Sequence, residues 1–246
     1  MSTTRYAVYA CPRREHPLTA LAEAWLGYSA WSGTDIDPCG VEGVERDQRD
    51  AFTRSARKYG FHATLKAPFR LAEGKTEADL IKAVERFAVS QGPASIEALV
   101  AKQMAGFSAL VPRDQSSALE TLAGAAVEAF EPYRAPLSDA DMERRLASPL
   151  SQKQIKLLVQ WGYPYVFEEF RFHFTLGGGV SEEAHAALHA AALRHFSSQI
   201  GAPFDVDHIA LYKQDHGDGT FRIIFDAALK NITVASRLPK TFTVTA

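Results

Sequence analysis

Two histidines, His62 and His173, stand in short segments that resemble each other although more than a hundred residues separate them. Both segments, 59–65 and 170–176, follow the pattern aromatic-x-Phe-His-x-Thr-Leu. Alternate side chains of a β-strand point to the same face. The spacing therefore predicts that each histidine shares a face with the threonine two residues on, while its Phe and Leu neighbours occupy the opposite, buried face.

Paired imidazoles of this kind suit the cleavage of a phosphoester. Because the unperturbed pKa of histidine is about 6.5, one ring can take a proton as base while the other gives one as acid. Threonine hydroxyls can donate to the non-bridging oxygens of phosphate, and nearby cations can offset the charge that builds on them. The predicted catalytic residues are His62 and His173, and the predicted substrate contacts are Thr64, Thr175, Lys66 and Arg171. This chemistry requires no metal and no other cofactor.

Each of these residues also has a plainer interpretation. A lone strand histidine is usually satisfied locally, threonine is a common β-former, and Lys66 or Arg171 can simply be charges that protect a strand edge. The duplication favours the catalytic interpretation of the histidines and threonines. His185 and His189 have a spacing that can bind a metal on a helix, but no Glu stands where such a motif needs it, so an exposed helix face is the preferred interpretation.

Composition limits the classes of protein that are plausible. The chain has 246 residues, a formal net charge of −2, and 46% hydrophobic and 23% charged residues. This balance is ordinary for a globular protein. The near-neutral charge argues against broad nucleic-acid binding, although a short RNA end is still a conceivable partner. The two cysteines, Cys11 and Cys39, are expected to be reduced thiols. With no visible signal peptide and no apolar run long enough to span a membrane, we expect a cytoplasmic protein without a membrane partner.

The order of the predicted elements favours an α+β fold with antiparallel sheets, because strands follow strands and no regular β-α-β alternation is present. Without an obvious linker, residues 1–246 are expected to form one domain. The predicted strands cover residues 5–11, 60–69, 94–102, 106–111, 170–176, 204–212, 220–225 and part of the tail, 232–246. The predicted helices cover residues 17–28, 76–89, 117–130, a short stretch after 138, 151–160 and 181–198, with a loop over 31–50.

The paired His-x-Thr motifs resemble the signature of the two-histidine (2H) phosphoesterase superfamily. The longer stretches Arg57–Lys66 and Trp161–Leu176, together with Arg5–Tyr9 and Phe130–Leu137, resemble a branch associated with bacterial phosphonate-utilisation operons. The resemblance covers most of the chain and is weakest in the C-terminal tail. It implies a single bilobed, pseudo-two-fold arrangement of two antiparallel sheets flanked by helices, in which the motifs 62–64 and 173–175 face each other across a central cleft.

For function, the resemblance implies a metal-independent phosphoesterase that acts on a small phosphorylated substrate. The expected substrate is a cyclic phosphodiester, such as a sugar or nucleotide cyclic phosphate or an intermediate of phosphonate metabolism. The resemblance also brings Tyr9 and Arg134 to the cleft. The stretch 161–165, which ends in Tyr165, is either a lid or stacking wall for the substrate or a helix stop with aromatic packing around Pro164. Two alternatives stay open, a non-catalytic protein that binds a phosphorylated ligand and an RNA end-processing 2′,3′-cyclic phosphodiesterase.

Overall fold

The computed structural model describes residues 4–37, 41, 44–104, 106–114 and 116–230. Its strands are β1 (Arg5–Ala10), β2 (Tyr28–Ser29), β3 (Thr34–Asp35), β4 (Ala63–Phe69), β5 (Ala94–Ile96), β6 (Leu99–Met104), β7 (Phe107–Pro112), β8 (Phe174–Gly178), β9 (Phe204–Val206), β10 (His208–Gln214) and β11 (Arg222–Ala228). Its helices are α1 (Pro17–Leu26), α2 (Arg46–Tyr59), α3 (Glu77–Ser90), α4 (Ser117–Phe130), α5 (Asp139–Leu146), α6 (Gln152–Trp161) and α7 (Glu182–His195), with short 3-10 turns η1 (Glu131–Tyr133) and η2 (Phe167–Glu169).

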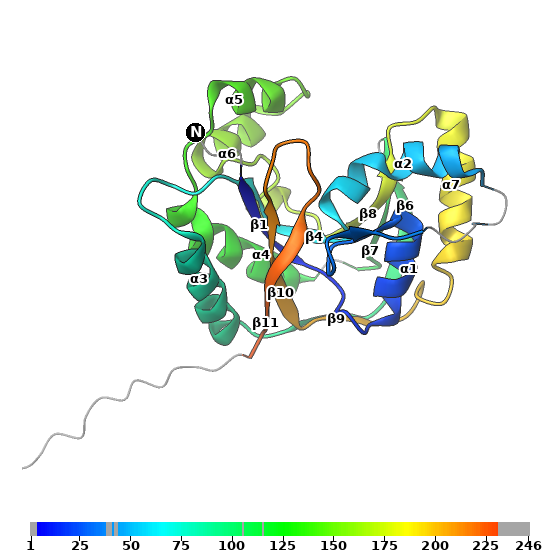
Figure 1. Ribbon diagram of the computed structural model, residues 1–246, viewed down its shortest axis with the longest axis horizontal. Coiled ribbons are helices and arrows are strands. Elements are labelled where there is room, and N and C mark those ends of the chain that lie inside the picture. Colours follow the sequence, from blue (N-terminus) through cyan, green and yellow to red (C-terminus); the bar gives the residue numbers. More distant parts are fainter. Residues whose placement is uncertain (1–3, 38–40, 42–43, 105, 115, 231–246) are drawn as a thin grey trace, which may run out of the picture.

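Two antiparallel sheets carry the two histidine motifs. One has the strand order β11-β10-β1-β4 and the other the order β6-β7-β8, while β2-β3 and β5-β9 form small pairs. Helices α3 and α4 lie beside the four-stranded sheet, and α1, α2 and α7 gather around the three-stranded one (Figure 1). The predicted α+β class with antiparallel sheets is therefore confirmed.

Helix α2 is the largest departure from the elements expected from the sequence. The sequence analysis predicted a loop over 31–50 and no element over 51–59. The helix is rich in Arg and Asp, and its buried side chains are only Arg49, Phe52, Thr53 and Ala56. These positions follow the spacing of one helix face. Because just two of the four are apolar, the hydrophobic pattern was too weak to reveal the helix.

The predicted strand boundaries also needed correction. His62 and His173 each stand directly before a strand, β4 and β8, rather than inside it. The single strand expected over 94–102 is two strands, of which β5 pairs with β9 and β6 with β7. The strand expected in 232–246 lies outside the described residues. Across the described part of the chain, no helix has the length and apolar character needed to cross a membrane.

A shared apolar core joins the two sheets next to the motifs. Phe61 stacks on Phe174, with ring centroids 4.8 Å apart and ring planes 14° from parallel. Phe61 precedes His62, and Phe174 follows His173. Both phenylalanines belong to one cluster of buried side chains that draws on both sheets. This contact fixes the start of β4 against the start of β8.

The expectation of an exposed face at His185 and His189 was wrong for His185, which is buried. Both rings lie 2.9 Å from the Ser108 hydroxyl on β7, through Nε2 of His185 and Nδ1 of His189. Side chains four residues apart share one helix face, and this face of α7 covers the three-stranded sheet. The pair is thus part of a buried polar contact between helix and sheet.

Candidate active site

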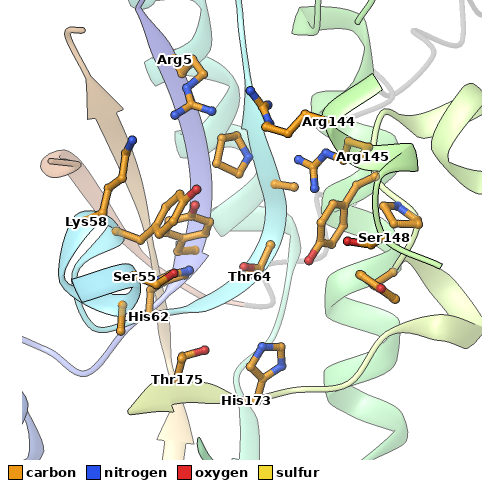
Figure 2. A pocket seen from close by; sticks show the side chains of 18 of the residues that line it. Arg5, Ser55, Lys58, His62, Thr64, Arg144, Arg145, Ser148, His173 and Thr175 are labelled. Carbon is orange, nitrogen blue, oxygen red and sulfur yellow. The ribbon is translucent and has the colours of Figure 1, made fainter. Parts of the chain in front are cut away.

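The two His-x-Thr motifs meet at one cavity of about 490 Å³. His62 and Thr64, at the start of β4, and His173 and Thr175, at the start of β8, all line it. All four side chains are half-buried, so they remain open to a ligand. Figure 2 shows these residues at one end of the pocket, with Thr175 beside His173. The structure therefore brings together four side chains that come from opposite halves of the chain.

Both imidazoles are held by the same type of hydrogen bond. Nδ1 of His62 lies 2.9 Å from the carbonyl oxygen of Gly60, and Nδ1 of His173 lies 2.7 Å from that of Arg171. A carbonyl oxygen can only accept, so each Nδ1 carries the hydrogen and each neutral ring keeps its lone pair on Nε2. In both motifs the accepting carbonyl is two residues before the histidine. The two rings thus present equivalent Nε2 atoms for acid–base chemistry.

Gly60 has a backbone conformation that suits this role. It ends α2 with a φ of 72°, in the left-handed region that glycine adopts without strain. A Cβ atom at this position would lie 2.7 Å from the Cβ of Ala30. Glycine therefore allows the chain to turn from α2 into the first motif while its carbonyl orients His62.

A β-bulge follows the first motif. Tyr9 of β1 pairs with Thr64, and the preceding Val8 pairs with Lys66, so Leu65 is an extra residue on β4. A bulge changes the phase of side-chain alternation along a strand. Strict alternation along the strand would place Lys66 on the face of Thr64, beside the substrate, and the bulge removes this expectation.

A matching bulge follows the second motif. Ala109 of β7 pairs with Thr175, and Ser108 pairs with Gly177, so Leu176 is the extra residue on β8. The extra residue is in both cases the leucine that ends the duplicated motif. The two motifs therefore share two structural features, the hydrogen bond from the histidine Nδ1 to a carbonyl before the strand and the bulge after the threonine. Their similarity is structural as well as one of sequence.

Lys66 lies in the protein interior instead of the cavity. Its side chain is only 3% exposed. Its Nζ donates to the carbonyl of Val127, at 2.9 Å, and to Oε2 of Glu131, at 2.6 Å. Burial lowers the pKa of the Lys66 amine even though Glu131 opposes this effect. The structure thus contradicts the predicted contact between Lys66 and phosphate, and gives the lysine a structural role against α4.

Replacing Lys66 with methionine tests this correction. We expect kcat/KM to stay within about twofold of the wild-type value, because the amine reaches no reacting group. Glu131 keeps its bonds to Arg134, which donates to it from Nε and Nη2. Steady-state assays on variants with matched circular dichroism spectra provide the measurement. A fall in kcat/KM of about tenfold or more is typical of a lost charge-assisted hydrogen bond. It would show that Lys66 does contact the phosphate.

The two other predicted cations, Arg134 and Arg171, have different outcomes. The guanidinium of Arg134 is engaged by Glu131 and by the carbonyls of Ala135 and Gln160, away from the main cavity, so the predicted substrate contact is contradicted. Arg171 donates to the carbonyls of Glu168 and Phe170. It lines an adjoining hollow of about 470 Å³, which His173 and Thr64 also border. A substrate contact through Arg171 stays a prediction for that hollow.

The aromatic residues Tyr9 and Tyr165 both line the main cavity. Tyr9 stacks on His62 with ring centroids 3.9 Å apart and planes 24° from parallel, so it covers one face of that imidazole. Tyr165 stands at the border of the cavity and the adjoining hollow and is 42% exposed. Tyr9, which is 1% exposed, supports the His62 ring, whereas Tyr165 is open to a ligand. A substrate contact through either tyrosine stays a prediction.

Sequence reasoning missed several residues that line the cavity. These are Arg5, Ser55, Lys58, Tyr59, Arg144, Arg145 and Ser148, while Tyr163, which also lines the cavity, lies in the stretch 161–165 that was considered as a wall for the substrate. They come from β1, α2, α5 and the segment after α5, and of these only Tyr59 belongs to the repeated motif. For Arg144 and Arg145 the only signal was their adjacency at the end of a short helix, and paired basic residues at a helix C-terminus usually serve the helix dipole.

Burial sets the protonation of the two imidazoles. It lowers the pKa of His62 to about 4, outweighing the bond to Gly60, and the charge of His173 lowers it further. Burial also lowers the pKa of His173 below its usual value, against the effect of the Arg171 carbonyl. Both rings are therefore neutral at pH 7 before an anion binds. Within the described residues, no cluster of three or more His, Cys, Asp or Glu side chains is arranged to hold a metal ion.

Fold and site together define an α+β protein with a paired His-x-Thr cavity between two antiparallel sheets. A family model described as a protein of unknown function (DUF1045) matches residues 64–222, and the chain belongs to this family. Two curated relatives carry the name ribose 1,5-bisphosphate phosphokinase PhnN. The relative from Janthinobacterium sp. (strain Marseille) is 32% identical over 224 residues, or 89% of this chain and 49% of its own. The relative from Laribacter hongkongensis (strain HLHK9) is 34% identical over 227 residues, or 89% and 50%.

This chain spans about half the length of the curated relatives it matches. Two solved structures are also similar. One, described as a phosphoesterase, has 14% identity and a TM-score of 0.42, and the other, E. coli LigT complexed with 3′-AMP, has 15% identity and a TM-score of 0.39. Each comparison covers 93% of this chain and 99% of the other. Because both TM-scores lie below 0.5, we base the functional proposal on the geometry of the site.

Proposed function

We propose that the chain is a metal-independent phosphoesterase of the two-histidine type that hydrolyses a small cyclic phosphodiester. One observation carries the proposal: His62 and His173 line one cavity, each with Nδ1 bonded to the carbonyl two residues before it and Nε2 left for chemistry. We also propose that the chain forms one bilobed domain, with the two motifs related by a pseudo-two-fold axis. The matched bulges after Thr64 and Thr175 support this relation.

The residues of the cavity suffice for a balanced reaction. The neutral imidazole removes a proton from water, and the water oxygen forms a bond to phosphorus. A ring P–O bond of the diester breaks, and the second imidazole, protonated, gives its proton to the leaving oxygen. Thr64 and Thr175 donate hydrogen bonds to the non-bridging oxygens. The product is a phosphate monoester, and proton exchange with solvent restores the two rings.

The curated relatives support a sugar phosphate as the class of substrate. Their name refers to a phosphorylated ribose, which agrees with a sugar cyclic phosphate of phosphonate metabolism. The present sequence contains no glycine-rich phosphate loop of the Walker type. We therefore assign the phosphokinase activity in the relatives' name to the part of those proteins that this chain does not span.

Turnover by the purified chain tests the proposal. After treatment with EDTA, the protein is offered ribonucleoside 2′,3′-cyclic phosphates, sugar cyclic phosphates and a short RNA ending in a 2′,3′-cyclic phosphate, and products are identified by ³¹P NMR. We expect undiminished opening of a small cyclic diester to a monoester. Tight binding of these compounds without any product would instead select the non-catalytic binder, and a strict requirement for RNA would select the RNA end-processing enzyme.

The lowered pKa values predict the dependence of turnover on pH. The reaction needs one neutral and one protonated imidazole. Neutral His62 is lost as the pH falls through about 4, and the protonated form of His173 is lost as the pH rises through a pKa below 6.5. We therefore expect a bell-shaped profile of kcat/KM with its maximum on the acid side of pH 6.5, whichever ring is the base. A plateau that extends past neutrality would contradict this pair of groups.

A further inference from the structure

The cavity has a second end that the proposed reaction does not use. Arg5, Arg144 and Arg145 lie together there, across the pocket from the two imidazoles, and Lys58 lies along one side (Figure 2). No Asp or Glu is among the described residues that line this cavity. The whole chain carries a formal charge of −2, so this concentration of positive charge is local and specific to the pocket.

Arg145 is held with part of its hydrogen-bonding capacity unused. Its guanidinium carbon lies 4.8 Å from the centre of the Tyr163 ring, which also lines the cavity. Its Nε is buried without a hydrogen-bond partner within the described structure. A buried donor left unsatisfied destabilises the folded state. Because Arg145 lines the cavity, an anion bound there can accept hydrogen bonds from its guanidinium.

Helix α5 is anchored through its first turn, and its last turn carries Arg144 and Arg145, of which Arg144 forms an ion pair with Asp141. Asp141, in the same helix, accepts hydrogen bonds from Arg70, from Ser138 and from Arg144. Although burial raises the pKa of Asp141, these bonds outweigh it and hold the pKa at about 2. The carboxylate is thus charged at any working pH, and it ties the helix to the residue that follows β4.

Arg5 and Lys58 reach the cavity from other elements. Nε of Arg5, the first residue of β1, donates to the side-chain amide of Gln214 at 2.7 Å, and its guanidinium lies over the Phe221 ring. Nζ of Lys58, near the end of α2, donates to the carbonyl of Gly217 at 2.8 Å. These are neutral partners, so the positive charges are positioned without being cancelled.

We propose that this end of the cavity is a second anion subsite, formed by Arg5, Arg144 and Arg145, and that it binds a phosphate monoester carried by the substrate at a distance from the reacting diester. The inference rests on the proposed function of the histidines and names the substrate class more closely. The substrate is a small molecule with two phosphate groups, of which one is cyclic and reacts between the imidazoles. Guanidinium groups are suited to the second because they bind phosphate with two parallel hydrogen bonds.

A pair of substrates that differ in one phosphate tests the subsite. We compare adenosine 2′,3′-cyclic phosphate with the same compound phosphorylated at the 5′ position, and measure kcat/KM for each. We expect a preference for the phosphorylated compound of about tenfold or more, as for a gained charge-assisted contact. In the Arg144→Gln, Arg145→Gln double variant this ratio should fall toward 1. Arg5→Gln, on a separate element, should lower it independently.

Arg86→Gln is the matched control. Arg86 lies on α3, donates to the Tyr133 hydroxyl and does not line the cavity, so its removal should leave the ratio of the two kcat/KM values unchanged. Equal turnover of the two substrates by the wild-type chain would overturn the subsite and leave the proposed function standing. A preference for a short RNA with a cyclic phosphate end over the 5′-phosphorylated nucleotide would overturn the monoester assignment.

A binding measurement separates the subsite from catalysis. Calorimetry compares adenosine 3′,5′-bisphosphate with adenosine 3′-monophosphate on the wild-type chain and on the double arginine variant. If the wild-type chain binds the bisphosphate more tightly and the variant loses this difference, the subsite is supported. This holds even if no cyclic ester is turned over, and in that case only the proposed function fails. Equal affinity for the two nucleotides overturns the subsite.

Discussion

Replacing His62 or His173 with alanine is expected to lower kcat by about 10²- to 10⁴-fold, the range typical of a lost general acid or base. Each ring lines the cavity, and each is oriented by a backbone carbonyl that holds its Nδ1 hydrogen. Because both rings act on one phosphorus in the proposed reaction, the double variant should lose little more than either single variant. Single-turnover and steady-state assays on a cyclic phosphate substrate measure these losses.

His189→Gln provides the control for these variants. His189 is a half-buried histidine on α7 whose Nδ1 contacts the Ser108 hydroxyl, and it does not line the cavity. Its replacement should leave kcat close to the wild-type value. A wild-type kcat in both the His62→Ala and the His173→Ala protein would contradict the proposed mechanism, because no other described histidine lines this cavity.

Replacing Phe174 with alanine is expected to lower the free energy of unfolding by about 3–5 kcal/mol, the range for a fully buried phenylalanine. Phe174 is 0% exposed and packs against Phe61, Phe172 and Phe204. Its contact with Phe61 joins the starts of β4 and β8, and these are the segments that carry the two histidines. The variant should therefore lose catalytic rate even under conditions in which it stays folded.

Urea or guanidinium unfolding measures the first effect, and turnover well below the melting temperature measures the second. Leu193→Ala is a suitable reference because Leu193 is 38% exposed on α7, and its replacement should change stability by about 0.5 kcal/mol or less. A Phe174→Ala protein with unchanged stability would contradict the description of the shared core. Combining it with Phe61→Leu should give a non-additive result, because the two rings are in contact.

The sequence predicted that the two histidines and the two threonines share one cavity, where their catalytic roles stay predictions, because residues two apart in an extended segment share a face. It failed at Lys66 because a bulge at Leu65 changes that alternation. Bulges leave no reliable signal in a single sequence, although the equivalent leucine of the second motif marks the same irregularity. The predicted role of Arg134 failed because a nearby carboxylate, Glu131, binds its guanidinium within the same turn of chain.

The cationic end of the cavity could not be predicted from the sequence, for a different reason. Arg5 and Arg145 lie far apart in the chain, on a strand and on a short helix, and only the tertiary fold brings them together. Long elements with clear caps were predictable, as for α3, where Thr76 and Asp79 form a capping box. Helix α2, with few apolar residues, was not. Local signals thus predicted single elements, while the composition of the cavity depends on their packing.

A crystal structure with vanadate or inorganic phosphate in the cavity tests the central claim most directly. The proposed mechanism requires that Nε2 of His62 and Nε2 of His173 both lie within about 3 Å of oxygens of one anion, with the hydroxyls of Thr64 and Thr175 on its remaining oxygens. An anion that contacts only one imidazole, or rings that turn Nδ1 toward it, would contradict the account.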